Sequence, residues 1–199
     1  MAGKTKLVGK NLDIALKMLH DVTSEIEKAN IPYWLEGGTL LGIIRENRIL
    51  PWDNDMDISM DSIHKNKLLW VSMKLFFKGY RISIKHFKKN FGPFKKGEFR
   101  MIKIRNFEPN FKKGEVMLDV FVKRKIDEQL FWAVGVKSPV LKSSPTKFTN
   151  QLDWYGFNKK KYMVPHDYKG YLTYRYGDWK IPVKTWDFKL DDNAIVSNN

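Results

Sequence analysis

Polar side chains, two of them acidic, alternate with apolar ones in the segment 55–60. Asp55 and Asp57 are separated by Met56 and followed by Ile58, which is the pattern of a half-buried strand. The two carboxylates therefore project from one face of that strand, with their α-carbons about 7 Å apart. Like charges at this spacing repel each other, and a hard divalent cation with a preference for oxygen ligands would offset the repulsion. The pattern predicts a metal site.

A further aspartate, Asp119, lies inside the apolar run Met117–Val122. An aspartate in an apolar strand is costly unless it is paired or bound to a metal. If this strand lies beside the first, Asp119 completes a group of three carboxylates, in which two Mg²⁺ ions could clamp a phosphoryl transfer from both sides. We therefore predict Asp55, Asp57 and Asp119 as catalytic residues and, together with Asp53, as ligands of Mg²⁺ or Mn²⁺.

Two adjacent glycines, Gly37 and Gly38, stand between a predicted strand over 33–36 and a predicted short helix over 39–45. Glycine lets the backbone approach a ligand closely, because it has no β-carbon. The N–H groups and dipole at the start of the helix favour a phosphate. We predict Gly37, Gly38 and Thr39 as contacts for a phosphate-bearing ligand.

The order of these features resembles the nucleotidyltransferase superfamily that includes DNA polymerase beta. A closer resemblance lies in Gly38–Arg45, which reads GTLLGIIR, and Leu50–Ile58, which reads LPWDNDMDI. Both are similar to the signature of the LicD family, which also contains the fukutin-related proteins. The segment Val164–Pro182 resembles the closing segment of the same family, so the resemblance extends from Tyr33 to Pro182.

The resemblance implies a nucleotidyltransferase-like fold and a divalent metal. It also implies a metal-dependent transferase that moves a phospho-alcohol, such as phosphocholine or ribitol phosphate, from a CDP-activated donor to a glycan hydroxyl. By position, Asp55 and Asp57 would hold the metal and Asp119 would be the third carboxylate. Asp119 would act as the general base or would orient the acceptor hydroxyl by way of a metal.

The resemblance also assigns residues to the donor side of the site. Gly38 and Thr39 would contact donor phosphates, and Arg45 would bind either those phosphates or the acidic loop, since a guanidinium binds oxyanions in bidentate fashion. The chain departs from the family at Asn54, where the family has the middle aspartate of its acidic triple. Further departures beside the expected donor pocket, which bear on donor choice, are Ile43, Glu46 and Arg48.

Hydrophobic periodicity places these motifs on an alternation of helices and strands. The predicted helices cover 11–29, 39–45, 61–77 and 167–176. The predicted strands cover 33–36, 55–60, 80–84, 99–105, 116–122, 130–134 and 152–157. In the third helix the expected core face consists of Leu68, Leu69, Val71, Ser72, Leu75 and Phe76. The order indicates an α+β (mixed α/β) fold with one central mixed sheet flanked by helices.

We expect a single domain over 1–199, with a core from about 10 to 188 and a frayed polar tail over 190–199. Between the elements, 86–97 is predicted to be a mobile basic loop and 138–146 a surface loop. Trp52 is predicted to anchor the acidic loop in the core, and the tyrosines near the C-terminus are predicted to pack.

Composition adds exclusions and alternatives. The 199 residues include no cysteine, which excludes a disulfide scaffold and thiolate chemistry. No apolar run is long enough to span a membrane, and we expect a cytoplasmic protein at or near a membrane surface. The net charge of +14 favours anionic partners. Among anionic partners, the resemblance implies a CDP-alcohol donor and a glycan or anionic polymer acceptor, with nucleic acid less favoured.

Two other functions stay open at this point. The same carboxylates would serve transfer of a nucleoside monophosphate from an NTP to a small molecule, protein or RNA. Alternatively, the basic segment with interleaved phenylalanines over 87–100 could bind nucleic acid or an anionic glycan without catalysis. The acidic cluster argues against a pure nucleic-acid binder, because it would repel the phosphate backbone.

Overall fold

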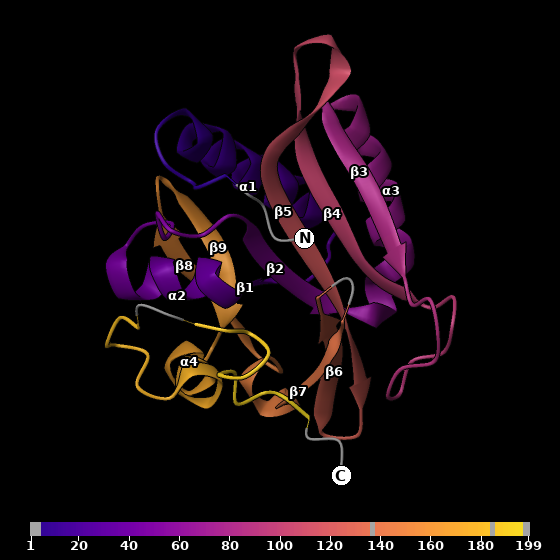
Figure 1. The fold of residues 1–199 in the computed structure, drawn as a ribbon, viewed down its shortest axis with the longest axis vertical. Coiled ribbons are helices and arrows are strands. Elements are labelled where there is room, and N and C mark those ends of the chain that lie inside the picture. The colour runs from indigo at the N-terminus through magenta and orange to yellow at the C-terminus, as the bar shows by residue number, and fades with distance from the viewer. Residues whose placement is uncertain (1–4, 136–137, 184–185, 197–199) are drawn as a thin grey trace.

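The computed structural model describes residues 5–135, 138–183 and 186–196 (Figure 1). The helices are α1 (Lys10–Lys28), α2 (Gly37–Glu46), α3 (Lys65–Phe77) and α4 (Tyr168–Tyr176). The first strands are β1 (Trp34–Glu36), β2 (Met56–Asp61), β3 (Tyr80–His86), β4 (Phe99–Glu108) and β5 (Lys112–Ile126). They are followed by β6 (Gln129–Val134), β7 (Val140–Pro145), β8 (Leu152–Phe157) and β9 (Lys160–Pro165).

A mixed sheet lies at the centre of the fold. Its strands follow the order β1-β2-β5-β4-β3, in which β2 and β5 are parallel and the other neighbours are antiparallel. The far end of the long strand β5 pairs with β6, which in turn pairs with β7 (Figure 1). β8 and β9 form a separate hairpin. The predicted mixed α/β class with one central mixed sheet is confirmed.

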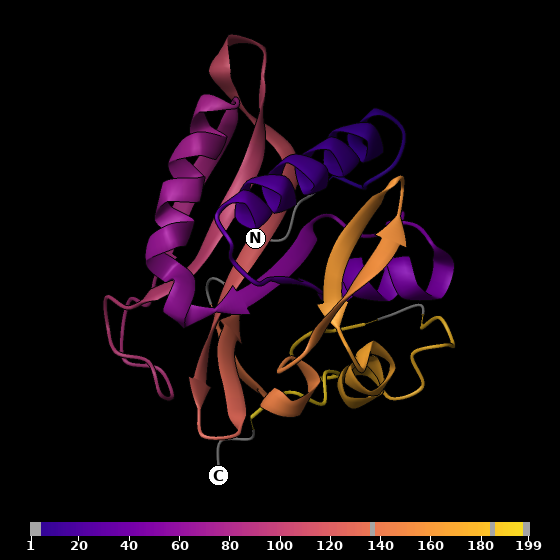
Figure 2. The ribbon, with the colours of Figure 1, turned by 180° about the vertical axis from the view of Figure 1, so that it is seen from behind.

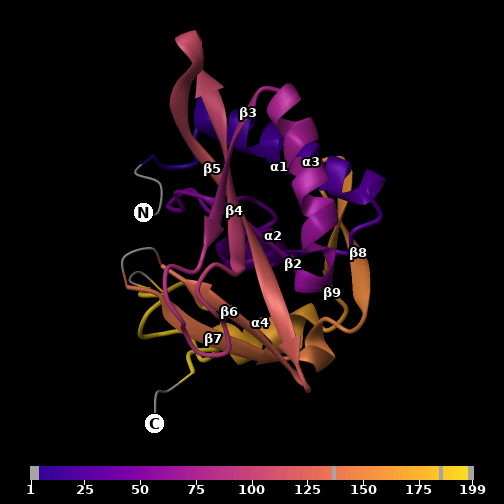
Figure 3. The ribbon, with the colours of Figure 1, turned by 90° about the vertical axis from the view of Figure 1, so that its right-hand side faces the viewer.

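Helices α1 and α3 cover one face of this sheet, as Figures 2 and 3 show from behind and from the side. Ile58 of β2 and Leu118 and Val120 of β5 are fully buried in the core with Leu19 and other apolar residues of α1. Since side chains alternate along a strand, the neighbours of these residues point to the opposite face. Asp119 therefore faces away from α1 and α3.

The described elements differ from the predictions in several places. The segment predicted as a surface loop over 138–146 contains β7, because pairing with β6 buries its polar residues Lys142 and Ser144. β9 was not predicted; its lysines break the apolar alternation.

Two predictions about buried side chains also differ from the structure. Trp52 is 44% exposed and its ring lies near the guanidinium of Arg48, so its predicted role as a core anchor is wrong. Leu69 and Phe76 lie on the exposed side of α3, not on its core face.

The polar C-terminal segment also differs from the prediction of a frayed tail. Asp192 and Ala194 are buried, and Ile195 forms a bridge with Lys142. Ion pairs to Asp192 hold this segment, which hydropathy alone does not reveal. Residues 197–199 of the predicted tail lie outside the described residues. Within the described ranges, no helix combines the length and the apolar character needed to cross a bilayer.

Candidate metal and donor site

Three of the four predicted carboxylates come together at one point on the sheet. Asp57 of β2 and Asp119 of β5 are direct partners in the parallel pairing, and Asp55 stands just before β2. One carboxylate oxygen from each of the three lies within 4.8 Å of the other two. Asp55 and Asp57 are half-buried and Asp119 is buried. We call this group the aspartate triad.

The triad holds more negative charge than its surroundings compensate. Burial raises the pKa of Asp55 to about 7, and the neighbouring Asp119 adds to the increase. Burial also holds the pKa of Asp57 well above its usual value, with further increases from Asp55 and Asp119. Each deprotonated carboxylate therefore costs free energy that a bound cation would recover.

Asp119 has a cationic partner that the sequence analysis did not single out. Lys103 of β4 forms an ion pair with one oxygen of Asp119. The other oxygen, Oδ1, is buried and accepts no hydrogen bond from the described residues. Burial raises the pKa of Asp119 despite the lowering effect of Lys103. Lys103 could have been predicted from strand alternation, because it lies directly opposite Asp119 in the pairing of β4 with β5.

The glycines shape the site differently from the prediction. α2 begins at Gly37, and the carboxylate of Glu36 accepts the Gly37 N–H at 3.2 Å, so this N–H is not free for a phosphate. Gly37 has a positive φ of 57°, and a β-carbon there would lie 2.7 Å from an oxygen of Asp57. The hydroxyl of Thr39 accepts the backbone N–H of Asp57 at 2.9 Å. Gly37 and Thr39 therefore position the start of β2.

Asp53 lies beside the triad, outside the group of three ligand atoms. A β-carbon at Gly38 would come within 2.1 Å of an Asp53 oxygen, so the close approach of this carboxylate requires glycine. Burial raises the pKa of Asp53 to about 6, although Arg45 and Lys6 lower it in part.

Arg45 is already engaged with other groups. It pairs with Glu46 at 2.6 Å and donates to the backbone oxygen of Trp179 at 3.2 Å. It therefore links α2 to the C-terminal segment. Its influence on the acidic loop is the partial lowering of the Asp53 pKa, as described above.

The donor set of the triad suits a hard divalent cation. All three candidate ligands are carboxylates, the ligand type that Mg²⁺ and Mn²⁺ prefer. The buried oxygen of Asp119 that accepts no hydrogen bond offers a free ligand atom. The residues therefore fit Mg²⁺ or Mn²⁺ at this point, with Asp55, Asp57 and Asp119 as the candidate ligands.

Comparison with known families matches residues 30–167 to the LicD/FKTN/FKRP nucleotidyltransferase domain. The chain belongs to this family. The matched region contains both glycines, the acidic loop and all three members of the triad. The predicted family is thereby confirmed, and the mixed sheet described above is the LicD-family fold of this chain.

Individual relatives match different lengths of the chain. The human ribitol-5-phosphate transferase FKTN is 30% identical over 190 residues, which cover 92% of this chain and 37% of FKTN. The mouse ribitol 5-phosphate transferase FKRP is 49% identical over 39 residues, 20% of this chain and 8% of FKRP. The chain thus spans little more than a third of FKTN.

Among solved structures, the lincosamide antibiotic adenylyltransferase LnuA, with lincomycin bound, aligns with a TM-score of 0.45 and 16% identity. The alignment covers 78% of this chain and 83% of LnuA.

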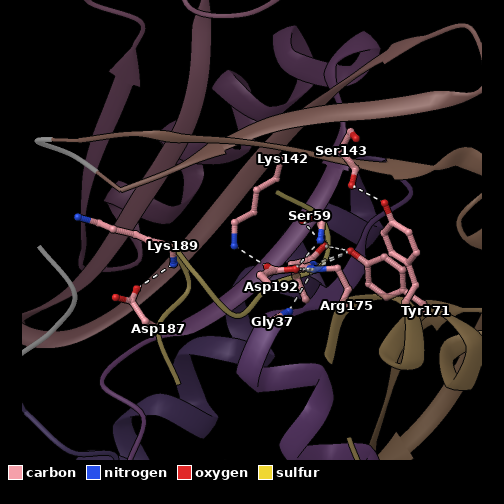
Figure 4. A network of polar contacts seen from close by, with 12 residues as sticks. Gly37, Ser59, Lys142, Ser143, Tyr171, Arg175, Asp187, Lys189 and Asp192 are labelled. Atoms are coloured by element: carbon pink, nitrogen blue, oxygen red, sulfur yellow. Dashed lines mark hydrogen bonds and ion pairs between the residues drawn. The ribbon is translucent and has the colours of Figure 1, made fainter. Parts of the chain in front are cut away.

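A second buried carboxylate cluster in this LicD-family chain surrounds Glu36, at the end of β1. Glu36 forms ion pairs with Lys123, at 2.5 Å, and with Arg175 of α4. It also accepts hydrogen bonds from Tyr171, at 2.8 Å, and Ser59, at 2.9 Å (Figure 4). Although burial alone would raise it, Lys123 and Arg175 hold the pKa of Glu36 well below its usual range.

This network extends from the sheet to the C-terminal segment. Arg175 pairs with Asp192 at 2.6 Å, and Lys142 of β7 pairs with the same carboxylate (Figure 4). These side chains are almost completely buried. We call Glu36, Lys123, Lys142, Arg175 and Asp192 the charge network. Sequence patterns do not reveal this network, because its members are far apart in the chain and each alone looks like a surface charge.

Proposed function

We propose that the chain is a divalent-metal-dependent transferase that moves a phospho-alcohol from a CDP-activated donor to a glycan hydroxyl. The observation that carries the proposal is the aspartate triad, whose carboxylates converge without enough positive charge among the described residues. The family supports a transferase, and the relatives FKTN and FKRP are ribitol-phosphate transferases by name. A ribitol phosphate or phosphocholine group is the proposed cargo.

In this proposal Asp55, Asp57 and Asp119 hold Mg²⁺ or Mn²⁺, with Asp53 beside them. When bound, the cation would neutralise the carboxylates and polarise the phosphoryl oxygens of the donor. Lys103, on the same face of the sheet, adds positive charge that attracts the donor phosphates. Gly38 and Thr39 are proposed to lie beside those phosphates.

The transfer forms one bond and breaks another at the phosphorus that carries the alcohol. The acceptor oxygen attacks this phosphorus, and the bond to the CMP oxygen breaks, so CMP leaves. Asp119 accepts the proton of the acceptor hydroxyl or orients that hydroxyl for attack. Burial raises the pKa of Asp119, which makes its carboxylate a stronger base than that of an ordinary aspartate.

The experiment is a product analysis of the purified chain with Mg²⁺ or Mn²⁺ and a panel of CDP-ribitol, CDP-glycerol, CDP-choline and the four NTPs. Release of CMP, with a gain of a phospho-alcohol in the acceptor mass, supports the proposal and names the donor. Release of pyrophosphate from an NTP, with a nucleotide on the acceptor, would overturn it in favour of nucleotidyl transfer. Donor turnover that persists in Asp57→Asn would also overturn it.

The cellular location is part of the same proposal. We place the chain in the cytoplasm and peripheral to a membrane, where a glycan acceptor under construction would be presented. The strongly basic composition supports an anionic surface or polymer as the neighbour of the chain.

A further inference from the structure

Helix α3 has two apolar faces, of which only one is used by the fold. Leu68, Val71 and Leu75 are buried in the core. The opposite side exposes large apolar side chains to solvent, with Trp70 67% exposed and Phe77 81% exposed. We call this side the outer face of α3. It consists of Leu69, Trp70, Met73, Phe76 and Phe77.

Positive charge borders this outer face. At 3.6 residues per turn, Lys67 and Lys74 lie along one side of the row formed by Trp70 and Phe77, and Lys65 lies on the other side. All three lysines are exposed. The stretch 62–97, which contains α3, β3 and the following loop, carries nine lysines, one arginine and no acidic residue. Most of the net charge of the chain therefore lies in this stretch.

The outer face of α3 also lies at the periphery of the molecule. Figures 2 and 3 show α3 at the outside of the sheet, next to the edge strand β3, with α1 on one side only. On β3, Ile82 and Ile84 lie on the α3 side of the sheet, in register with the core residues Ile104 and Ile102 of β4, and the basic residues of the strand alternate to the opposite face. A flat partner could therefore reach the exposed apolar side chains of α3 and the lysines of the same helix together.

We propose that the outer face of α3 binds a lipid bilayer that contains anionic headgroups. Helices that lie in the bilayer interface combine tryptophan, phenylalanine and leucine on one side with flanking lysines, and this combination is present here. The lysines attract anionic phosphates, while Trp70 and Phe77 enter the region of the acyl chains. A nucleic-acid duplex would engage the lysines through its phosphates, but its bases are stacked and would leave both aromatic side chains in water.

This surface leaves the candidate site accessible. α3 packs on one face of the sheet, and Asp119 points to the other, so bilayer binding would not cover the aspartate triad. Bilayer binding at α3 rests on the membrane placement proposed above, but it does not depend on the transfer reaction. Loss of vesicle binding should therefore leave turnover of a water-soluble donor unchanged.

The test is sedimentation of the full chain with vesicles of phosphatidylcholine alone and of phosphatidylcholine mixed with phosphatidylglycerol. We expect binding to the mixed vesicles only, with weakening as salt rises, because salt screens the lysines. The variants Trp70→Ser/Phe77→Ser and Lys67→Glu/Lys74→Glu should each bind at least about tenfold more weakly. All these side chains are exposed, so a thermal melt should show that both variants stay folded.

Matched variants elsewhere on the surface show whether vesicle binding depends on the outer face of α3 or on positive charge in general. Trp154→Ser removes another exposed tryptophan, and Lys161→Glu/Lys169→Glu makes the same charge change away from α3. Both should bind vesicles like the wild type. Equal loss in these controls, or no binding of the wild type to mixed vesicles, would overturn the proposal. A different result would also overturn it. Light scattering would show a wild-type dimer that becomes monomeric in Trp70→Ser/Phe77→Ser, while vesicle binding of this variant stays unchanged.

Discussion

Two carboxylate clusters lie side by side in this chain and have opposite surroundings. Glu36 and Asp57 are direct partners in the pairing of β1 with β2. Glu36 is buried among Lys123, Arg175 and hydroxyl donors, and its pKa lies well below the usual range. Asp57 is surrounded by other aspartates, and its pKa lies well above that range.

The difference separates a structural role from a binding role. In the charge network, cations of the chain itself compensate each buried carboxylate, so the network holds the C-terminal segment on the sheet. In the aspartate triad, Lys103 forms an ion pair with Asp119 alone among the three. A cation bound from solution would therefore compensate the negative charge of the triad. The charge network already contains the cations that compensate its carboxylates.

Among the changes that test the difference between the two clusters, the largest expected effect is on the stability of the fold. Arg175→Met leaves Glu36 and Asp192 without their shared buried partner, and such a loss costs about 3–5 kcal/mol of the free energy of unfolding. Urea denaturation measures this cost. The control Arg124→Met removes a partly exposed ion pair with Glu98 and should cost less than about 1 kcal/mol. Similar costs in the two variants would contradict a structural role for the network.

The aspartate triad should show the reverse behaviour. Asp57→Asn removes a candidate metal ligand and should lower the rate of transfer by about a thousandfold, which corresponds to about 4 kcal/mol of lost stabilisation. The same variant should keep or raise the melting temperature in the absence of metal, because repulsion within the triad falls. Asp13→Asn, an exposed aspartate on α1, should change neither quantity. A destabilised Asp57→Asn would assign the triad a structural role instead.

A smaller effect is expected at Gly37, which lies between the two clusters. Gly37→Ala forces alanine into a positive φ, at a cost of about 1–2 kcal/mol, and brings its β-carbon against the Asp57 carboxylate. Both stability and transfer should therefore fall, in contrast to the two variants above. Thermal melts and the transfer assay measure the two effects. Gly156→Ala, where a β-carbon meets open space, provides the control.

The contributions of the two clusters to stability should change in opposite directions with pH. The raised pKa of Asp55 means that the folded state binds more protons than the unfolded state between about pH 4 and pH 7, so stability falls as pH rises through this window. The slope is at most about 1.4 kcal/mol per pH unit for one proton. The lowered pKa of Glu36 acts oppositely, and its contribution is lost as pH falls below the usual glutamate pKa.

Melting curves of the metal-free chain at several pH values would separate these contributions. Asp55→Asn should flatten the decline in stability above pH 4, while Glu36→Gln should leave that decline unchanged. An identical slope in the wild type and Asp55→Asn would show that this carboxylate ionises as it would in water.

The triad could be predicted from the sequence because its parts are local or follow strand alternation. Asp55 and Asp57 lie on one strand, and a single assumption about neighbouring strands brings Asp119 to them. The family resemblance extends over the same segments, and the family is confirmed. Most helices and strands followed from periodicity for the same reason, within a few residues of their bounds.

The remaining features depend on contacts between distant segments. The charge network joins residues up to 139 positions apart, and a buried lysine such as Lys142 looks like a loop residue until β7 pairs with β6. Hydropathy could not show which side of α3 packs in the core, because both sides are apolar. Arg45 was expected to bind donor phosphates or the acidic loop; its additional contacts with Glu46 and the C-terminal segment join residues that the sequence pattern does not bring together.

The most direct test of the account is titration of Mg²⁺ into the chain at pH 7 by calorimetry, in two buffers with different heats of ionisation. Carboxylates with raised pKa values must lose protons when a cation binds. We expect binding with proton release in the wild type and in Asp13→Asn, and loss of both in Asp57→Asn. Binding that is unchanged in Asp57→Asn, or no binding to the wild type, would contradict the assignment of the aspartate triad as a metal site.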